Sequence, residues 1–507
     1  MESSDGATSA AVRWAGRIGA PALGVLVWWL LPHLGGAEMS ESARATAGVV
    51  ALIAILWMTE ALPLPATSLL PIVLLPATGV TSVAKAAAPY ADRFVFLFMG
   101  GFMLALAMER WGLHRRIALR IVLGVGAGPL RLIAGFMLAT AVLSMWVSNT
   151  ATAVMMLPIG MSVAGLVRDR LGTYESGTAH DTRNFSTCLM LGIAYAASIG
   201  GVGTLIGTPP NVVLAGTLEK SLSIDLGFVD WMMVGVPLAM VFLAIAWLVL
   251  TRIVYPVRIP AIPGGRALIR GELDRLGRTS RGEWSVLVVF VFTAAAWVLR
   301  EPLLRVPGVG DAMPVLGRVD DAVIAIAAAV ALFAIPVEPK RGVFALDWGT
   351  AVRLPWGVLL LFGGGLSLAA AMQESGLDRW IGERLGGFGA LPAPVLVLIV
   401  TASIVFLSEV ASNTAIAAAF LPIMVGVAQA AEIDPVLLMA PTALAASYAF
   451  MLPVGTPPNA IVFGSGHVTM KQMVRAGVWL NLIAIGLIML VTFTLVPLVL
   501  PSGVSTP

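Results

Sequence analysis

The chain has 507 residues, of which 58% are hydrophobic and only 12% are charged. Water-soluble domains carry about 25% charged residues, so this composition excludes a soluble protein, and its hydrophobicity equally excludes a disordered chain. The net charge of +3 comes from 31 Lys and Arg residues scattered through short loops. That scatter argues against a nucleic-acid surface and is typical of membrane topology. We therefore expect an all-α polytopic membrane protein.

Apolar stretches recur along the chain at about the 20-residue length that a helix needs to cross a bilayer. Eleven are predicted to be spans: 18–34, 46–62, 65–80, 94–110, 187–217, 230–253, 284–300, 321–338, 355–373, 436–466 and 477–499. Of these, 187–217 and 436–466 are interrupted by Gly and Pro and are predicted to be broken helices.

Two further apolar stretches, 132–167 and 392–431, are each short for two spans with a loop and carry Ser-Asn-Thr near the middle. We predict that both are re-entrant hairpins that enter and leave the membrane on one side. Irregular backbone at such a depth is tolerated only where protein or a water-filled cavity surrounds it.

The basic residues predict the orientation of this layout. With the N-terminus in the cytoplasm, 22 of the 31 Lys and Arg residues fall on the inner side, where such residues concentrate. We expect a multi-pass protein of the inner (plasma) membrane. An Arg-rich cytoplasmic linker at 254–283 divides the chain into halves.

The two halves repeat the same motifs in the same order. Ser148-Asn149-Thr150 recurs 264 residues later as Ser412-Asn413-Thr414, and Gly-Thr-Pro-Pro-Asn at 207–211 recurs 248 residues later at 455–459. Five crossings separate equivalent elements, an odd number, so the repeats are predicted to be inverted. Inverted repeats with broken helices in matching positions indicate a carrier whose site lies at the membrane midplane.

The paired motifs also predict a chemistry. Ser, Asn and Thr are favoured helix caps, and capping alone is one reading of the Ser-Asn-Thr motif. However, Pro breaks a helix, and a broken helix exposes carbonyl oxygens at one end and amides at the other. Oxygens suit an alkali cation, whereas helix N-termini suit an anion. Two pairs of breaks therefore predict two cation sites that flank one anion site.

Few ionisable residues accompany these motifs. Between Leu132 and Leu166 there is none, Glu409 is the one charge in the second hairpin, and Glu60 lies near a span. Proton carriers use buried ionisable residues, so this scarcity favours sodium coupling. Glu409 is either a coupling group or a hydrogen-bonded structural residue. Motifs of metalloproteases, nucleotide-binding loops and serine hydrolases are missing from the sequence, so we expect neither an enzyme nor an organic cofactor.

The paired motifs resemble those of the divalent anion/sodium symporter family, the INDY-type di- and tricarboxylate and sulfate carriers, over about residues 18–499. The resemblance implies a homodimer that works as an elevator. It implies a scaffold from 18–127 and 284–388, with interfacial arms near 111–127 and 375–388, and a moving transport domain from 128–253 and 389–499. Residues 1–17 would be a cytoplasmic N-terminus and residues 500–507 a C-terminal tail.

The resemblance also implies a role for particular residues. Substrate contacts would come from Ser148, Asn149, Thr150, Thr208, Pro209, Ser412, Asn413, Thr414, Thr456 and Pro457. The first sodium site would use Ser144, Ser148, Asn149 and Gly207, and the second Ser408, Ala411, Asn413 and Gly455. At two of these positions, Ser408 and Gly455, relatives often have Thr and Ala.

From these features we expect sodium-coupled uptake of a C4-dicarboxylate such as succinate, fumarate or malate, across a lipid bilayer and without a nucleic-acid partner. Three alternatives stay open at this stage. One is a sodium-independent dicarboxylate exchanger, one is a citrate or sulfate carrier on the same scaffold, and the most remote is a passive anion channel.

Overall fold

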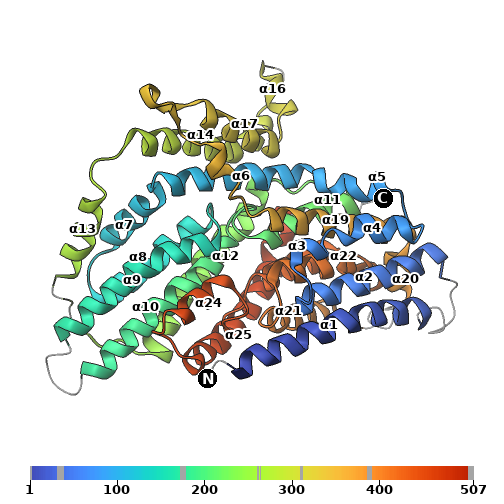
Figure 1. Ribbon diagram of the computed structural model, residues 1–507, viewed down its shortest axis with the longest axis horizontal. Helices are drawn as coiled ribbons and strands as arrows, with labels where there is room; N and C mark the ends of the chain where they lie inside the picture. Colours follow the sequence, from blue (N-terminus) through green and yellow to red (C-terminus); the bar gives the residue numbers. More distant parts are fainter. Residues whose placement is uncertain are drawn as a thin grey trace.

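A computed structural model describes residues 3–30, 39–171, 178–259, 262, 264–308, 312–384 and 391–500. Within these ranges the chain is predominantly helical (Figure 1). Eight of the described helices are long and apolar enough to cross a membrane, and several shorter apolar helices accompany them. These helices fit the multi-pass membrane protein expected from composition.

The first part of the chain forms short and long helices in alternation. Their bounds are α1 (Ser3–Leu30), α2 (Glu41–Thr59), α3 (Leu64–Thr67), α4 (Leu70–Ala77), α5 (Val83–Ala87), η2 (Ala88–Ala91), α6 (Arg93–Arg110) and α7 (Leu113–Val125). The predicted span 65–80 is wrong as one continuous helix: it is split between α3 and α4, because Pro71 has no amide to continue the ladder. The predicted boundary at residue 17 is also not a helix boundary, since α1 already begins at Ser3; residues 31–34 of that span lie outside the described ranges.

The next segment contains the first hairpin and the first broken helix. It consists of α8 (Pro129–Ser144), α9 (Asn149–Leu171), α10 (Thr178–Gly201), α11 (Pro209–Leu222), α12 (Phe228–Leu248) and a π-helical turn η3 (Val249–Val254). Helices α8 and α9 meet at the tip 145–148, as expected for the hairpin 132–167. The predicted break in 187–217 lies at 202–208, between α10 and α11.

The middle of the chain begins with α13 (Gly265–Arg275), so part of the expected linker 254–283 is helical. The elements that follow are α14 (Arg281–Leu304), α16 (Pro314–Arg318), α17 (Asp321–Ala334), the antiparallel pair β1 (Pro336–Glu338) and β2 (Val343–Phe344) with η4 (Pro339–Arg341) between them, α18 (Trp348–Ala351), α19 (Trp356–Ser375) and α20 (Leu377–Arg384). The expected span 321–338 ends early at Ala334, because Pro336 disfavours helical backbone before it.

The last segment contains the second hairpin and the second broken helix. Its elements are α21 (Ala393–Leu407), α22 (Asn413–Ala430), α23 (Val436–Ala446), α24 (Pro457–Gly464), α25 (Met470–Thr494) and α26 (Val496–Val499). The tip between α21 and α22 covers 408–412. The second break, at 447–456, separates α23 from α24 and is longer than the first.

The helix boundaries repeat the spacing of the motifs. Helices α7 and α20 begin 264 residues apart, and so do α9 and α22, while α11 and α24 begin 248 residues apart. The halves therefore share an order of arm, hairpin and broken helix.

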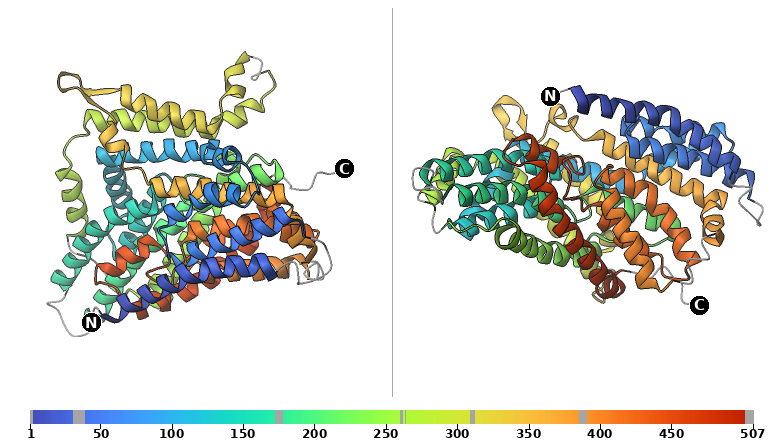
Figure 2. Two further views of the ribbon diagram at one scale, coloured as in Figure 1. Left: turned by 45° about the vertical axis from the view of Figure 1, so that its right-hand side comes forward. Right: turned by 90° about the horizontal axis from the view of Figure 1, so that it is seen from below.

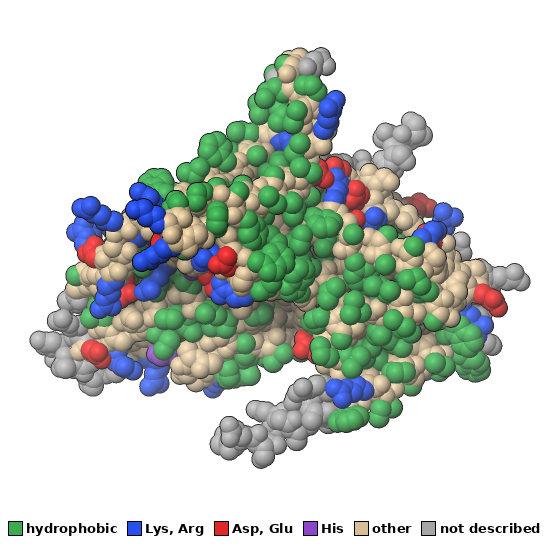
Figure 3. Space-filling model, turned by 45° about the horizontal axis from the view of Figure 1, so that its top comes forward, with side chains coloured by type: hydrophobic (Ala, Val, Ile, Leu, Met, Phe, Trp, Pro, Cys, Tyr) green, Lys and Arg blue, Asp and Glu red, His purple; other side chains and the backbone are tan. Residues whose placement is uncertain are grey.

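The helices pack in layers around a continuous apolar core. Helices α1 and α2 lie side by side along one edge, and α14 and α17 form an outer layer against α6 (Figure 2). Hydrophobic side chains cover much of one face of the molecule, while charged side chains gather mainly toward its two ends (Figure 3). Exposed apolar side chains on α14, such as Phe292 at 72% exposure, are those of a lipid-facing helix.

Candidate functional site

Four helices begin at one cavity. The first residues of α9, α11, α22 and α24 are Asn149, Pro209, Asn413 and Pro457, and all four line a cavity of about 1020 Å³. A helix N-terminus carries the equivalent of roughly half a positive charge, because its first amides have no partner in the helix. The backbone therefore gives the cavity a positive electrostatic potential.

The cavity contains every residue that the sequence assigned to the substrate. Its lining includes Ser148, Asn149, Thr150, Thr208, Pro209, Ser412, Asn413, Thr414, Thr456 and Pro457. Gly207 and Gly455, expected at the sodium sites, line it as well. The other three expected sodium ligands, Ser144, Ser408 and Ala411, are buried outside the lining.

Oxygen atoms converge around Gly207 in the first repeat. The hydroxyl of Ser144 lies 2.5 Å from Oδ1 of Asn149 and 2.8 Å from the carbonyl oxygen of Ala197. A Cβ atom added at Gly207 would lie 2.3 Å from the carbonyl oxygen of Gly201 and 3.0 Å from that of Ser144. The structure thus brings Ser144, Asn149 and Gly207 together. The sequence did not indicate Ala197 or Gly201, since a backbone carbonyl has no side-chain signature.

The corresponding place in the second repeat includes a carboxylate. A Cβ atom added at Gly455 would lie 3.2 Å from Oε2 of Glu409 and 3.3 Å from its carbonyl oxygen. Oδ1 of Asn413 is buried and has no hydrogen-bond donor near it. The hydroxyl of Ser408 donates to the carbonyl of Val405 at 2.8 Å, which leaves its lone pairs free. Ser408 and Asn413 thus have acceptor oxygens without a donor, and the backbone of Gly455 lies beside Glu409.

Glu409 holds the second break in place. Its side chain is 3% exposed and accepts hydrogen bonds from the amides of Phe450, Met451 and Leu452 at 2.7–3.0 Å. Nδ2 of Asn481 donates to it at 2.7 Å. These contacts agree with the hydrogen-bonded structural reading of Glu409.

The last Asn of each Gly-Thr-Pro-Pro-Asn motif reaches back to its own break. Nδ2 of Asn211 donates to the carbonyl of Thr204 at 2.7 Å, and Nδ2 of Asn459 donates to the carbonyls of Ala449 and Leu452 at 3.0 and 3.1 Å. The Oδ1 atoms of both Asn residues are buried without a donor. These oxygens, like that of Asn413, are therefore acceptors without a protein donor beside the two breaks.

Capping explains only part of the motifs. The hydroxyl of Ser148 accepts from the amide of Ala151 at 3.2 Å, and that of Thr456 accepts from the amide of Asn459 at 3.3 Å. The side chains of Ser412 and Thr208 make no such bond, although both precede a helix. The last two hydroxyls are free to contact a ligand in the cavity.

The wall opposite the motifs carries ionisable residues. Glu60, Glu109, His114 and Arg353 line the cavity from the ends of α2 and α6 and the starts of α7 and α19. Burial lowers the pKa of His114, which keeps it neutral near pH 7. Among the described lining residues Arg353 is the one Arg or Lys. The sequence indicated Glu60 alone, because the other three share no spacing or motif.

Comparisons with known proteins agree with this geometry. Residues 12–500 match the family model described as "Sodium:sulfate symporter transmembrane region". The chain is 42% identical over 472 residues to the "Sodium-dependent dicarboxylate transporter SdcS" of Staphylococcus saprophyticus, covering 93% of this chain and 89% of that protein. It is 44% identical over 459 residues to the protein of that name from Staphylococcus aureus strain USA300, covering 90% and 86%.

A solved structure shares the fold. The YdaH transporter of Alcanivorax borkumensis aligns with a TM-score of 0.54 at 14% identity, over 83% of this chain and 88% of that one. At this identity the likeness concerns the fold.

Proposed function

The chain belongs to the family of the sodium:sulfate symporter transmembrane region, and on that premise we propose that it is a secondary active transporter that takes up C4-dicarboxylates together with sodium ions. The observation that carries this proposal is the meeting of four helix N-termini at one cavity, flanked by two clusters of oxygen atoms. The family and the similar proteins named above are transporters rather than enzymes.

The anion is held by backbone and neutral side chains. Helix N-termini favour an anion; α9 and α22 offer their first amides, whereas α11 and α24 each begin with two Pro residues that have no amide N–H. Eight of the ten motif residues on the lining, all except Pro209 and Pro457, add side-chain amide or hydroxyl groups, and none of the ten is Lys or Arg. Succinate, fumarate and malate have the two carboxylates that such a pair of hairpin tips would receive, one from each repeat.

Sodium ions would supply the remaining positive charge that balances the dianionic substrate. The oxygens near Gly207 and Gly455 are hard ligands of the kind that alkali cations prefer, and the buried Oδ1 atoms of the motif residues Asn211, Asn413 and Asn459 lack a donor. A cation bound at each break would order the hairpin tip that contacts the substrate. Substrate affinity should then rise with sodium, and sodium affinity should rise with substrate by the same factor.

The relatives favour a dicarboxylate over sulfate or citrate. The description of the family model names sulfate, but the proteins with 42–44% identity over about nine-tenths of this chain are named for dicarboxylates. No feature of the structure favours exchange without sodium, and alternating access through broken helices distinguishes the proposal from a passive channel.

Transport is proposed to follow an elevator mechanism in a homodimer, as the resemblance implies. We name residues 18–127 and 284–388 the scaffold body, and residues 128–253 and 389–499 the transport body. Glu60, Glu109, His114 and Arg353 lie on the scaffold wall of the cavity, at helix ends that the charge bias places on the inner side. With a cytoplasmic N-terminus, we therefore propose that the cavity faces the cytoplasm.

Orientation is tested by thiol labelling of the linker. Arg278 is exposed, whereas Ser280 caps α14 and accepts from the amide of Glu283, so Arg278 is the better site for a probe. In a Cys188→Ala background, Arg278→Cys should resist impermeant maleimides in intact cells and react after permeabilisation. Rapid labelling of intact cells would invert the proposed topology.

The function is tested by uptake of labelled succinate into proteoliposomes. An inward sodium gradient should drive accumulation, potassium or choline should not replace sodium, and a proton ionophore should have little effect once the membrane potential is clamped. Sulfate and citrate serve as competitors. Uptake that persists without sodium and requires internal dicarboxylate would replace the symporter with an exchanger, and failure to accumulate against a gradient would indicate a channel.

A further inference from the structure

A group of charged residues joins the two proposed bodies at one end of the molecule. We name it the interbody ion cluster; its members are Asp92, Arg93 and Arg305 on the scaffold body, and Glu219, Lys220, Asp225 and Asp230 on the transport body. The scaffold residues lie at the ends of α6 and α14, and the others lie on α11, on α12 and in the segment between those helices.

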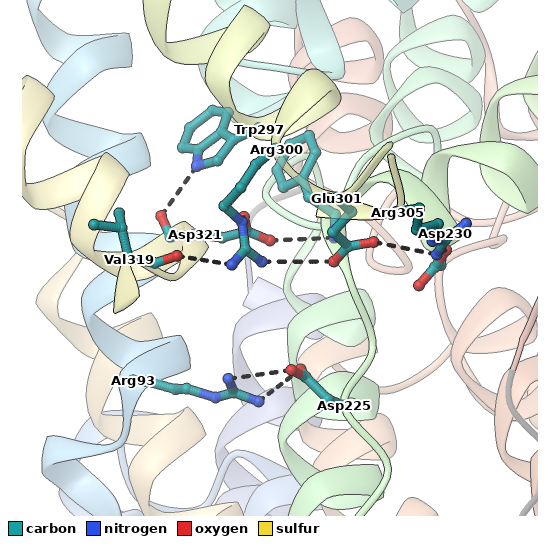
Figure 4. A network of polar contacts seen from close by, with 10 residues as sticks. Arg93, Asp225, Asp230, Trp297, Arg300, Glu301, Arg305, Val319 and Asp321 are labelled. Carbon is teal, nitrogen blue, oxygen red and sulfur yellow. Dashed lines mark hydrogen bonds and ion pairs between the residues drawn. The ribbon is translucent and has the colours of Figure 1, made fainter. Parts of the chain in front are cut away.

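The cluster contains four ion pairs that cross between the bodies. A guanidinium nitrogen of Arg93 lies 3.0 Å from Glu219 and 2.7 Å from Asp225. Nζ of Lys220 lies 3.2 Å from Asp92, whose side chain is 5% exposed. Arg305 approaches Asp230 at 3.4 Å. Figure 4 shows Arg93 reaching toward Asp225, and Arg305 toward Asp230.

Other contacts at the same end tighten this junction. The amide of Phe228 on α12 donates to Asp321 on α17 at 3.2 Å. Glu301 approaches so closely that a Cβ atom at Gly227 would lie 2.2 Å from its Oε1. Trp146 of the first hairpin tip also stacks with Trp297 of α14 at 6.4 Å between ring centroids.

The distribution of ion pairs over the molecule is one-sided. Of the ion pairs between described residues, those that join the two bodies all belong to this cluster; the others lie within one body or involve the linker. The large cavity, by contrast, is lined by Glu109 at the other end of α6. Arg93 and Glu109 are about 24 Å apart along the helix, at about 1.5 Å per residue. The charge pairs between the bodies thus lie at one end of α6 and the cavity lies toward the other.

From this arrangement, and resting on the proposed transport function, we propose that the interbody ion cluster is a latch that exists only while the cavity is open at the opposite end. Movement of the transport body along the scaffold must separate Arg93 from Glu219 and Asp225, and Arg305 from Asp230. The latch thereby sets the equilibrium between the two access states, and its rupture is part of each transport cycle.

The first test neutralises two cations of the latch. Arg93→Gln/Arg305→Gln removes three of the four pairs and leaves three acidic residues without these partners. The control is Lys85→Gln, which removes the pair between Lys85 and Glu374 at 3.0 Å, inside the scaffold body. Val154→Cys in a Cys188→Ala background reports access, since Val154 lines the cavity and is 53% exposed.

The readout is labelling by an impermeant maleimide from each face of membrane vesicles. The unmodified latch should give fast labelling from the cavity's open face and slow labelling from the other. The Arg93/Arg305 variant should shift this ratio toward the other face by roughly two- to fivefold, as expected for the loss of a few exposed ion pairs, while Lys85→Gln should not. An unchanged ratio in a folded variant would overturn the latch.

A second test does not depend on how the neutralised variant folds. Arg93→Cys/Asp225→Cys, joined by a cleavable bifunctional thiol reagent, should lose uptake on cross-linking and regain it on reduction. Full uptake by cross-linked protein would also overturn the latch. The labelling test is separate from the proposed function, because the labelling ratio needs no substrate. The cross-linking test is read against unmodified protein, and absence of sodium-driven dicarboxylate uptake in that protein would refute the proposed function and not the latch.

Discussion

The two helix breaks follow the same motif but are held by different forces. In the first repeat, Met145 packs against Gly203, where a Cβ atom would lie 2.9 Å from its methyl carbon. In the second repeat, the residue 264 positions later is Glu409, which accepts from the amide of Met451. Met451 follows Gly203 by 248 positions. At equivalent positions, one repeat therefore has an apolar side-chain contact and the other has a hydrogen bond to a carboxylate.

This difference leads us to expect that the two proposed cation sites are not equivalent. The oxygens near Gly207 are neutral, whereas those near Gly455 include a buried carboxylate. A nearby negative charge strengthens cation binding, and it does so most where water is excluded. We expect the second site to bind sodium more tightly and to order its hairpin tip first.

The strongest test of what the breaks share is removal of the motif Asn. Asn149→Ala and Asn413→Ala should each abolish sodium-driven uptake, because each removes a cation ligand and a substrate contact together. Oδ1 of Asn413 has no donor, whereas that of Asn149 accepts from Ser144, so Asn149→Ala should lower thermal stability more. Uptake assays with melting curves check both points, and wild-type transport by either variant would remove that Asn from the site.

Glu409→Gln tests what the breaks do not share. The amide group cannot accept all the hydrogen bonds that the carboxylate accepts, and each buried donor left unpaired costs about 1–3 kcal/mol. We expect uptake to fall by roughly tenfold, since 1.4 kcal/mol corresponds to a factor of ten, with a raised sodium requirement. Met145→Leu, a volume-conserving change at the matching position, should retain uptake; unchanged sodium activation of Glu409→Gln would refute the asymmetry.

Alanine at the two motif glycines gives a smaller contrast. At Gly207 the new Cβ meets a backbone carbonyl at 2.3 Å, while at Gly455 its nearest neighbour is a side-chain carbon of Ala449 at 3.0 Å. Overpacking costs about 1–3 kcal/mol, so Gly207→Ala should lose several-fold in uptake and Gly455→Ala should stay near wild type. Sodium titrations of both variants measure the difference, and equal losses would contradict it.

The smallest expected effect concerns the two motif serines. Ser148 caps α9 through the amide of Ala151, whereas the Ser412 side chain makes no capping bond to α22. Loss of a cap costs about 1 kcal/mol, so Ser148→Ala should lower the melting temperature and Ser412→Ala should leave it nearly unchanged. Similar melting shifts for the two would show that capping does not distinguish the repeats.

The sequence predicted the long elements and the breaks because their causes are local. Length and hydropathy predict helices such as α12 and α25, and Pro with Gly predicts the interruptions before α11 and α24. The broken helix at 65–80 was missed because Pro71 and its neighbours lie within an uninterrupted apolar run. Motif spacing predicted the two pairs of breaks, and the family resemblance implied the ten substrate residues, all of which line the cavity.

The rest of the site depends on tertiary contacts that no single segment encodes. Backbone carbonyls such as that of Ala197, which accepts from Ser144, carry no residue signature, and the hydrogen bonds from Phe450 and Asn481 to Glu409 join positions 41 and 72 residues apart. Arg353 and Glu109 meet at the cavity only after α6 and α19 have packed. Which oxygen atoms complete each cation site could therefore be found only in three dimensions.

The four helix N-termini that meet at the cavity have a consequence for how such carriers diversify. Their positive potential belongs to peptide groups, so no single side-chain replacement can erase it. Changes to lining residues such as Thr150 or Thr414 instead alter shape and hydrogen-bond pattern. The fold itself therefore favours anions, while substitutions of lining side chains can change which anion binds. This is expected in a family whose members are named for sulfate and for dicarboxylates.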